Sequence, residues 1–234
     1  MEEYTLRRLT HEIEDKLVAL SGVVCRVVMN DHLKDNVYLA GIWRHDLPFG
    51  LFWRSTSGGS PLHNGVPSWS WASISGKVES GLEPWFGHGE AFDIVAAHVT
   101  PKADPYGQVR GGSIRISAQI FDKFDLSKSS DTSQGYYFRV SGVPDYLSRY
   151  LSCWLDVRDL RELDNLSNIY YCFWPLEHVG IGLLLEKVET GKFKRIVFFS
   201  SPYTNFFHCA KSQRPDLDDY EHLYKAGQYT FSII

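Results

Sequence analysis

The sequence lacks any run of about eighteen apolar residues, the length that a membrane-spanning helix requires, and its charged N-terminus is unlike a secretory signal. We therefore expect a cytoplasmic protein that does not associate with membranes. A basic excess is also missing, because the 234 residues carry a formal net charge of −4 and the pI is about 6.1. Nucleic-acid surfaces normally cluster Lys and Arg, so we expect no nucleic-acid partner.

The usual catalytic and cofactor motifs are absent as well. The four cysteines are widely spaced, without the pairs of a zinc or redox site, which favours reduced and mostly buried thiols. The nine histidines contain no His-x-x-x-His pair, and no Walker or Rossmann glycine pattern occurs. A Gly-x-Ser-x-Gly elbow is also missing, which disfavours a hydrolase. We expect neither a metal nor a cofactor.

Aromatic residues are abundant instead, at 15% of the chain. Four tryptophans, Trp43, Trp53, Trp69 and Trp71, fall within about thirty residues. Trp69 and Trp71 are two positions apart, so in an extended strand their indoles would project from the same face. Such a pair either fills a core or forms the wall of a pocket.

Hydrophobic spacing predicts a mainly β protein with an N-terminal helical segment, of the α+β class. We expect one compact domain, with a helical part over residues 1–54 and an antiparallel β-barrel or sandwich over residues 55–234. Apolar residues at three- to four-residue spacing, including Ile13, Leu17 and Val24, predict a helix over 10–29. A second short helix is expected over 35–43, and an exposed loop over 121–134. Strands are expected over 69–74, 92–100, 113–121, 136–140, 152–157, 179–188, 193–199 and 228–234.

Several motifs follow one another along the first third of the chain. They are Tyr4, Arg7, Leu9-Thr10, the stretch Asp15–Gly22, Tyr38-Leu39-Ala40-Gly41-Ile42-Trp43, Leu51-Phe52-Trp53 and Pro67-Ser68-Trp69-Ser70-Trp71-Ala72-Ser73. Together they resemble the segment that follows the HET domain in fungal heterokaryon-incompatibility proteins. The resemblance implies a fungal protein built from the C-terminal region of that family and standing alone, without the HET domain. It implies no cell-death role, since that role belongs to the HET domain, and it brings no catalytic residues.

Two segments offer polar candidates for catalysis. Arg44 and His45 follow Trp43 and could hydrogen-bond a ligand near the tryptophans, although a surface ion pair explains them equally well. The glycine-containing run 85–90 could form a mobile lip over a cavity, with Trp85 and Phe86 as apolar contacts and His88 and Glu90 as polar ones. An exposed loop without a role explains that run equally well.

Two functions remain open. The first is a cofactor-independent cyclase of fungal secondary metabolism, Diels–Alderase-like, which folds an apolar small molecule and hydrogen-bonds it. Trp43, Trp53, Trp69 and Trp71, with Trp85 and Phe86, would contact the substrate, although a scaffold role is favoured for the first four. The alternative is a non-catalytic regulatory module, derived from a HET-type protein, that binds a protein partner. An apolar pocket of roughly 300–1,000 Å³ favours the first, and a flat apolar surface favours the second.

Overall fold

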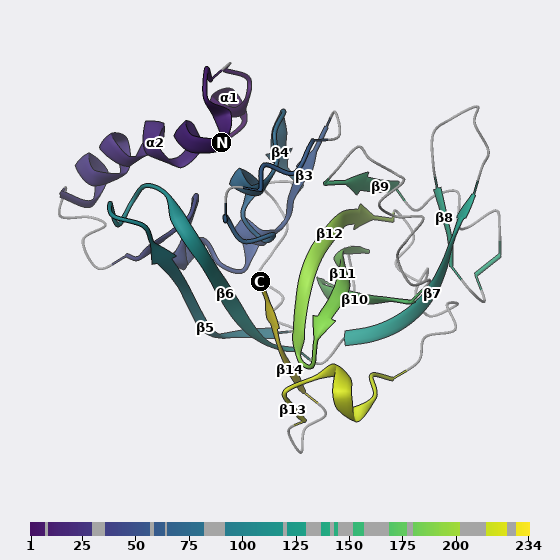
Figure 1. Cartoon of the computed structure of the whole chain (residues 1–234). Coiled ribbons are helices and arrows are strands. Elements are labelled where there is room, and N and C mark those ends of the chain that lie inside the picture. Colours follow the sequence, from purple (N-terminus) through teal and green to yellow (C-terminus); the bar gives the residue numbers. More distant parts are fainter. Residues whose placement is uncertain are drawn as a thin grey trace.

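The computed structural model confirms the mainly β fold with an N-terminal helical segment (Figure 1). The structure describes residues 1–7, 9–29, 36–56, 59–63, 65–81, 92–118, 121–129, 137–140, 143–144, 152–156, 169–176, 180–201, 214–223 and 228–234. Of residues 124–129, 137–140, 155, 169–170 and 173–176 only the backbone is described.

The N-terminal segment contains a short helix, α1 (Glu2–Thr5), and the longer α2 (Glu12–Met29), which confirms the helix expected from the apolar spacing. Leu17 and Val24 of α2 are buried, but Ile13 is 56% exposed although it was expected on the buried face. Lys16 is buried instead, because its ammonium donates a hydrogen bond to the Ile74 carbonyl and lies 5.6 Å from the ring centroid of Trp71. A charged residue therefore anchors α2 to the rest of the molecule.

The helix expected over residues 35–43 is wrong where the chain is described. Tyr38–Leu39 (β1) and Ile42–Trp43 (β2) pair as an antiparallel hairpin, in the register Tyr38↔Trp43 and Leu39↔Ile42. The two turn residues, Ala40 and Gly41, have φ values of 45° and 101°. Positive φ at both central positions is what a tight two-residue hairpin needs, and a helix cannot include it.

The strand expected over residues 69–74 is also wrong, because Trp71–Ser73 form a 3₁₀ turn. The hydroxyl of Ser70 caps this turn by accepting the N–H of Ala72, and the hydroxyl of Ser73 donates to the Ser70 carbonyl. Serine side chains favour such local capping over strand pairing. Two further 3₁₀ turns, Arg44–Asp46 and Phe49–Leu51, lead into β3 (Trp53–Ser55), which pairs with β4 (Val78–Ser80).

One large sheet takes up most of the remaining described residues. Its strands are β5 (Phe92–Pro101), β6 (Val109–Ala118), β7 (Phe121–Ser129), β8 (Tyr137–Val140), β9 (Ser152–Leu155), β10 (Ile169–Leu176), β11 (Ile181–Glu189), β12 (Lys192–Ser200), β13 (His222–Leu223) and β14 (Tyr229–Ile233). Their order is β5-β6-β14-β12-β11-β10-β7-β8, with β13 beside β14 and β9 beside β12. Among these strands only β12 and β14 pair in parallel. The arrangement is sandwich-like and the sheet does not close into a barrel, so the sandwich alternative describes the fold.

The exposed loop expected over residues 121–134 is wrong over its first part, which is strand β7. The ring of Phe121 is fully buried and stacks on Phe231 at a centroid distance of 4.1 Å. The charged residues of this segment are typical of an exposed loop, so the sequence did not indicate a strand here. Lys123 is accommodated at the sheet because its ammonium pairs with Asp216 at 2.7 Å and with Asp219 at 3.2 Å.

The core gathers the motifs of the first third of the chain around the tryptophans. Trp71 donates its indole N–H to the Gly41 carbonyl at 2.9 Å, and Ser70 donates its hydroxyl to the Ala40 carbonyl at 2.5 Å. The ring of Tyr4 packs edge-on against Trp71 at a centroid distance of 5.8 Å. Motifs distant in the sequence therefore form one interlocked unit.

Candidate functional site

The tryptophan cluster is mostly core. Trp53, Trp69 and Trp71 are exposed by 2% or less, and Trp43 is half-buried against the Tyr38 ring at 5.2 Å. The Trp53 indole N–H donates to the Trp69 carbonyl at 2.8 Å. The indole N–H of Trp69 is buried without an acceptor among the described residues. The structure thus brings Trp53, Trp69 and Trp71 into one core cluster that does not include Trp43. The predicted contact of these four residues with a substrate stays a prediction.

The polar candidates that the structure describes, Arg44 and His45, are exposed. Arg44 donates to the Ala97 carbonyl at 3.2 Å, and His45 pairs with Asp46 at 3.0 Å on the exposed surface. A catalytic role for Arg44 and His45 stays a prediction beside these surface contacts. The candidates Trp85, Phe86, His88 and Glu90 lie outside the described residues.

A cavity of about 520 Å³ lies where strands β6 and β12 separate. Strand β14 pairs with β6 along five residues but with β12 only at Lys192 and Phe193. Figure 1 shows β6 and β12 diverging beyond the end of β14. The cavity is lined there by Gly111 and Gly112 of β6, by Lys194 and Arg195 of β12, and by residues of the loop between 61 and 68.

Ser68 joins the strands that border this cavity. Its backbone N–H donates to the Ile234 carbonyl at 3.1 Å, and its hydroxyl donates to the same carbonyl. That hydroxyl also accepts the backbone N–H of Arg195 at 2.9 Å. The next residue of β12, Ile196, accepts the backbone N–H of Asp156, where β9 takes over the pairing. One serine therefore completes the edge of β12 between β14 and β9 and fixes the loop at the cavity.

A buried ion pair lies beside Ser68. The Arg195 guanidinium contacts Asp156 through two hydrogen bonds, Nε to Oδ2 at 2.9 Å and Nη2 to Oδ1 at 3.1 Å. It also donates to the carbonyls of Leu51 at 2.6 Å and Trp53 at 2.5 Å, and its central carbon lies 3.4 Å from the ring centroid of Trp53. Burial raises the pKa of Asp156, and the charge and hydrogen bonds of the guanidinium oppose this effect.

The rest of the lining is apolar, with a few polar groups at its margin. The apolar residues of the lining are Pro61, Val66, Pro67, Ile74, Val188 and Ile234. The polar side chains besides the buried pair are His63, Ser68, Ser73 and Lys194. Such a lining can hold an apolar body and contact one polar end of it. Among the residues that the structure describes, no group of three His, Cys, Asp or Glu is placed to hold a metal ion.

Sequence reasoning missed Asp156, Lys194 and Arg195 as site residues. Asp156 and Arg195 are 39 positions apart and meet only because β9 pairs with β12. The segment Lys192-Phe193-Lys194-Arg195 has the composition of an ordinary strand start with three basic residues. Nothing in the sequence indicates that Arg195 is buried. Ser68 belongs to the Pro67–Ser73 motif, but the sequence does not distinguish it from the other serines of that motif.

No family model, no curated protein and no solved structure matches the chain. The resemblance to HET-type proteins therefore rests on the quoted motifs and stays a prediction. No helix in the described part of the chain is long and apolar enough to cross a membrane.

Proposed function

We propose that the protein binds an apolar small molecule in the cavity between β6 and β12. The observation that carries this proposal is the cavity itself, whose volume of about 520 Å³ and mainly apolar lining suit a small organic ligand. The loop wall and the β12 edge are well anchored, because Ser68 hydrogen-bonds Ile234 and Arg195, and Arg195 pairs with Asp156. A preformed site of this kind loses little conformational entropy on binding.

The reaction that we propose for the bound molecule is a cofactor-independent cyclisation of a natural-product precursor, of the Diels–Alderase type. An apolar cavity that holds two reacting parts of one chain together can lower the barrier by several kcal/mol, up to about 7–11 kcal/mol. Lys194 lines the same cavity and supplies a donor for a carbonyl whose polarisation assists the reaction. This step rests on binding and fails if binding fails.

Binding is tested with N-phenylnaphthylamine, a neutral dye whose fluorescence rises in apolar sites. We expect saturable binding to the wild-type protein and at least a fivefold loss of affinity in Val188→Trp, whose larger side chain fills the cavity. Val188 is 55% exposed, so the fold tolerates this change. Val95→Trp is the matched control, because Val95 is 45% exposed on β5 and is not among the described lining residues. Equal binding by all three proteins would contradict the proposed site.

Cyclisation is tested by incubating the protein with fungal metabolite extracts and analysing the mixtures by mass spectrometry. We expect one compound to be consumed while an isomer of the same mass appears, and we expect Val188→Trp to slow this conversion. Binding of a compound without any isomeric product would remove the enzyme proposal and leave the binding proposal in place.

The alternative, a regulatory module with a protein partner, has an observation of its own. Helix α2 exposes Ile13, Val18, Val23 and Met29, each by 44% or more. These residues are spread around the helix, so contact with a protein partner would cover more than one of its sides. If a second copy of the chain covers them, light scattering will give a dimer mass for the wild-type protein and a monomer mass for Val23→Glu. A monomer mass for both proteins would contradict this form of the alternative.

A further inference from the structure

The cavity carries an unbalanced positive charge although the whole chain is acidic. Among its described lining residues, the charges of Asp156 and Arg195 neutralise each other within one bidentate pair. Lys194 is the remaining permanent charge of that lining, and no ion pair with another described residue within 4 Å engages it. His63 lies on the same lining, and its ring nitrogens can hydrogen-bond a ligand.

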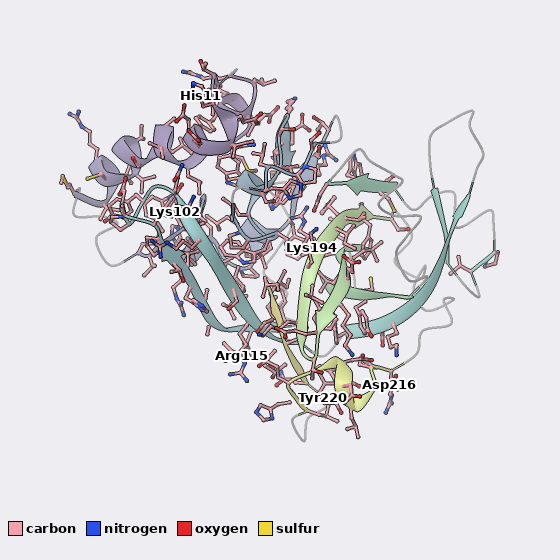
Figure 2. All side chains as sticks on the ribbon, viewed as in Figure 1. His11, Lys102, Arg115, Lys194, Asp216 and Tyr220 are labelled. Atoms are coloured by element: carbon pink, nitrogen blue, oxygen red, sulfur yellow. The ribbon has the colours of Figure 1, made fainter. Side chains whose placement is uncertain are left out.

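The position of Lys194 makes this charge available to a ligand. Successive side chains of a strand point to opposite faces, so Arg195 points into the core while Lys194 is exposed. Figure 2 shows Lys194 between β6 and β12 in this view, where the cavity lies. The facing residue in the β11–β12 register is Glu186, which is not among the described lining residues. Glu186 and Lys194 therefore lie on the same face of the sheet, but no ion pair within 4 Å joins them, and of the two only Lys194 lines the cavity.

We propose that the ligand is an apolar molecule with one anionic oxygen group, such as a carboxylate, a sulfonate or an enolate, which Lys194 contacts. This inference rests on the proposed binding function and specifies the class of ligand. The apolar lining would hold the body of the molecule and the ammonium would fix its charged end. A charge-assisted hydrogen bond at a partly exposed site strengthens binding roughly five- to tenfold.

The test compares two dyes with the same aromatic frame. Anilinonaphthalene sulfonate carries one sulfonate, and N-phenylnaphthylamine is its neutral counterpart. We expect Lys194→Met to weaken binding of the sulfonate about five- to tenfold and to leave the neutral dye unchanged. Lys194→Arg keeps the charge and should keep the wild-type ratio of the two affinities. Lys192→Met is the matched control, because Lys192 is exposed on the same strand, pairs with Glu189 at 2.5 Å and does not line the cavity as described.

The outcomes separate this inference from the function on which it rests. Unchanged binding of both dyes to Lys194→Met, or equal weakening of both, would overturn the anionic ligand class and leave the binding function intact. The same loss in Lys192→Met would also overturn it, because the effect would then be a general one of surface charge. If neither dye responds to Val188→Trp in the otherwise wild-type protein, the cavity is not the site and both proposals fall.

Discussion

Arg195 joins parts of the chain that lie far apart in the sequence. Its guanidinium contacts Asp156 and the carbonyls of Leu51 and Trp53, and both members of the ion pair are exposed by 3% or less. Taking two charges out of water is costly, and the pair offsets this cost only while both partners are present. We therefore regard the pair as a specific clamp between the tryptophan motifs and strand β12.

The first prediction concerns this pair. Asp156→Ala leaves the guanidinium buried without its partner and should lower the free energy of unfolding by about 3–5 kcal/mol. The double variant Asp156→Ala/Arg195→Met should lose less than the sum of the two single losses, with a coupling of about 2 kcal/mol. Urea unfolding measures all three, with Lys192→Met as an exposed control that changes stability by less than about 0.5 kcal/mol. Additive losses would contradict a coupled pair.

The second prediction compares two glycines. Gly41 has a φ of 101°, and a Cβ there would lie 2.6 Å from the Trp71 indole nitrogen. We expect Gly41→Ala to lower the free energy of unfolding by about 2–4 kcal/mol. Gly22 is helical, and a Cβ there would meet nothing within 4 Å. Gly22→Ala should therefore raise stability by about 0.5–1 kcal/mol. Urea midpoints that shift in the same direction for both variants would contradict this account.

At the level of elements, the short 3₁₀ turn Leu217–Asp219 contacts the large sheet through the carboxylate of Asp219, beside the Lys123–Asp216 pair. Asp219 accepts hydrogen bonds from the Tyr171 hydroxyl at 2.7 Å, the Lys187 ammonium at 2.7 Å and the Asp216 N–H at 2.7 Å. Burial alone would raise the pKa of Asp219, but these bonds, together with Lys123, outweigh it and hold the pKa at about 2. The turn is therefore attached through an ionised side chain.

The third prediction is the pH dependence of this attachment. In the unfolded chain an aspartate titrates at about 3.9, so the folded state favours the ionised form. The stabilisation is complete above about pH 4 and is lost as the pH falls through about 2. Asp219→Asn should destabilise the protein at pH 7, and its deficit relative to wild type should shrink at pH 3 and below. A deficit that stays constant between pH 7 and pH 2.5, measured by urea unfolding, would contradict this role.

Among the elements, helix α2 and most strands of the large sheet could be predicted from the sequence. The alternation of polar and apolar residues in Ser113-Ile114-Arg115-Ile116 predicts which face of the strand is buried. The hairpin at Ala40-Gly41 could not be predicted this way, because four strand residues are too few to show a period. Strand β7 was missed because its charges find partners, Asp216 and Asp219, that only the fold brings near.

At the level of the whole molecule, the site arises from the way the large sheet divides. Near its C-terminal end, strand β14 pairs with both β6 and β12. Beyond this end β6 and β12 separate, and the cavity lies between them. From the sequence, the tryptophans of the Pro67–Ser73 motif could form either a core or a pocket wall. Pro67, Ser68 and Ser73 line this cavity, but its described lining includes no Trp, Tyr or Phe. The sequence could not show which strands face this motif, because that depends on the sheet order. The chemistry of Lys194 and Asp156 became visible only with this topology.

The central claim, a ligand site between β6 and β12, is tested most directly by a crystal structure of the protein with N-phenylnaphthylamine. We predict that the dye lies between Gly111 and Gly112 of β6 and Lys194 of β12, against Val188, with the Asp156–Arg195 pair intact. A dye bound to the exposed face of α2, with the cavity closed or filled by protein side chains, would contradict the claim.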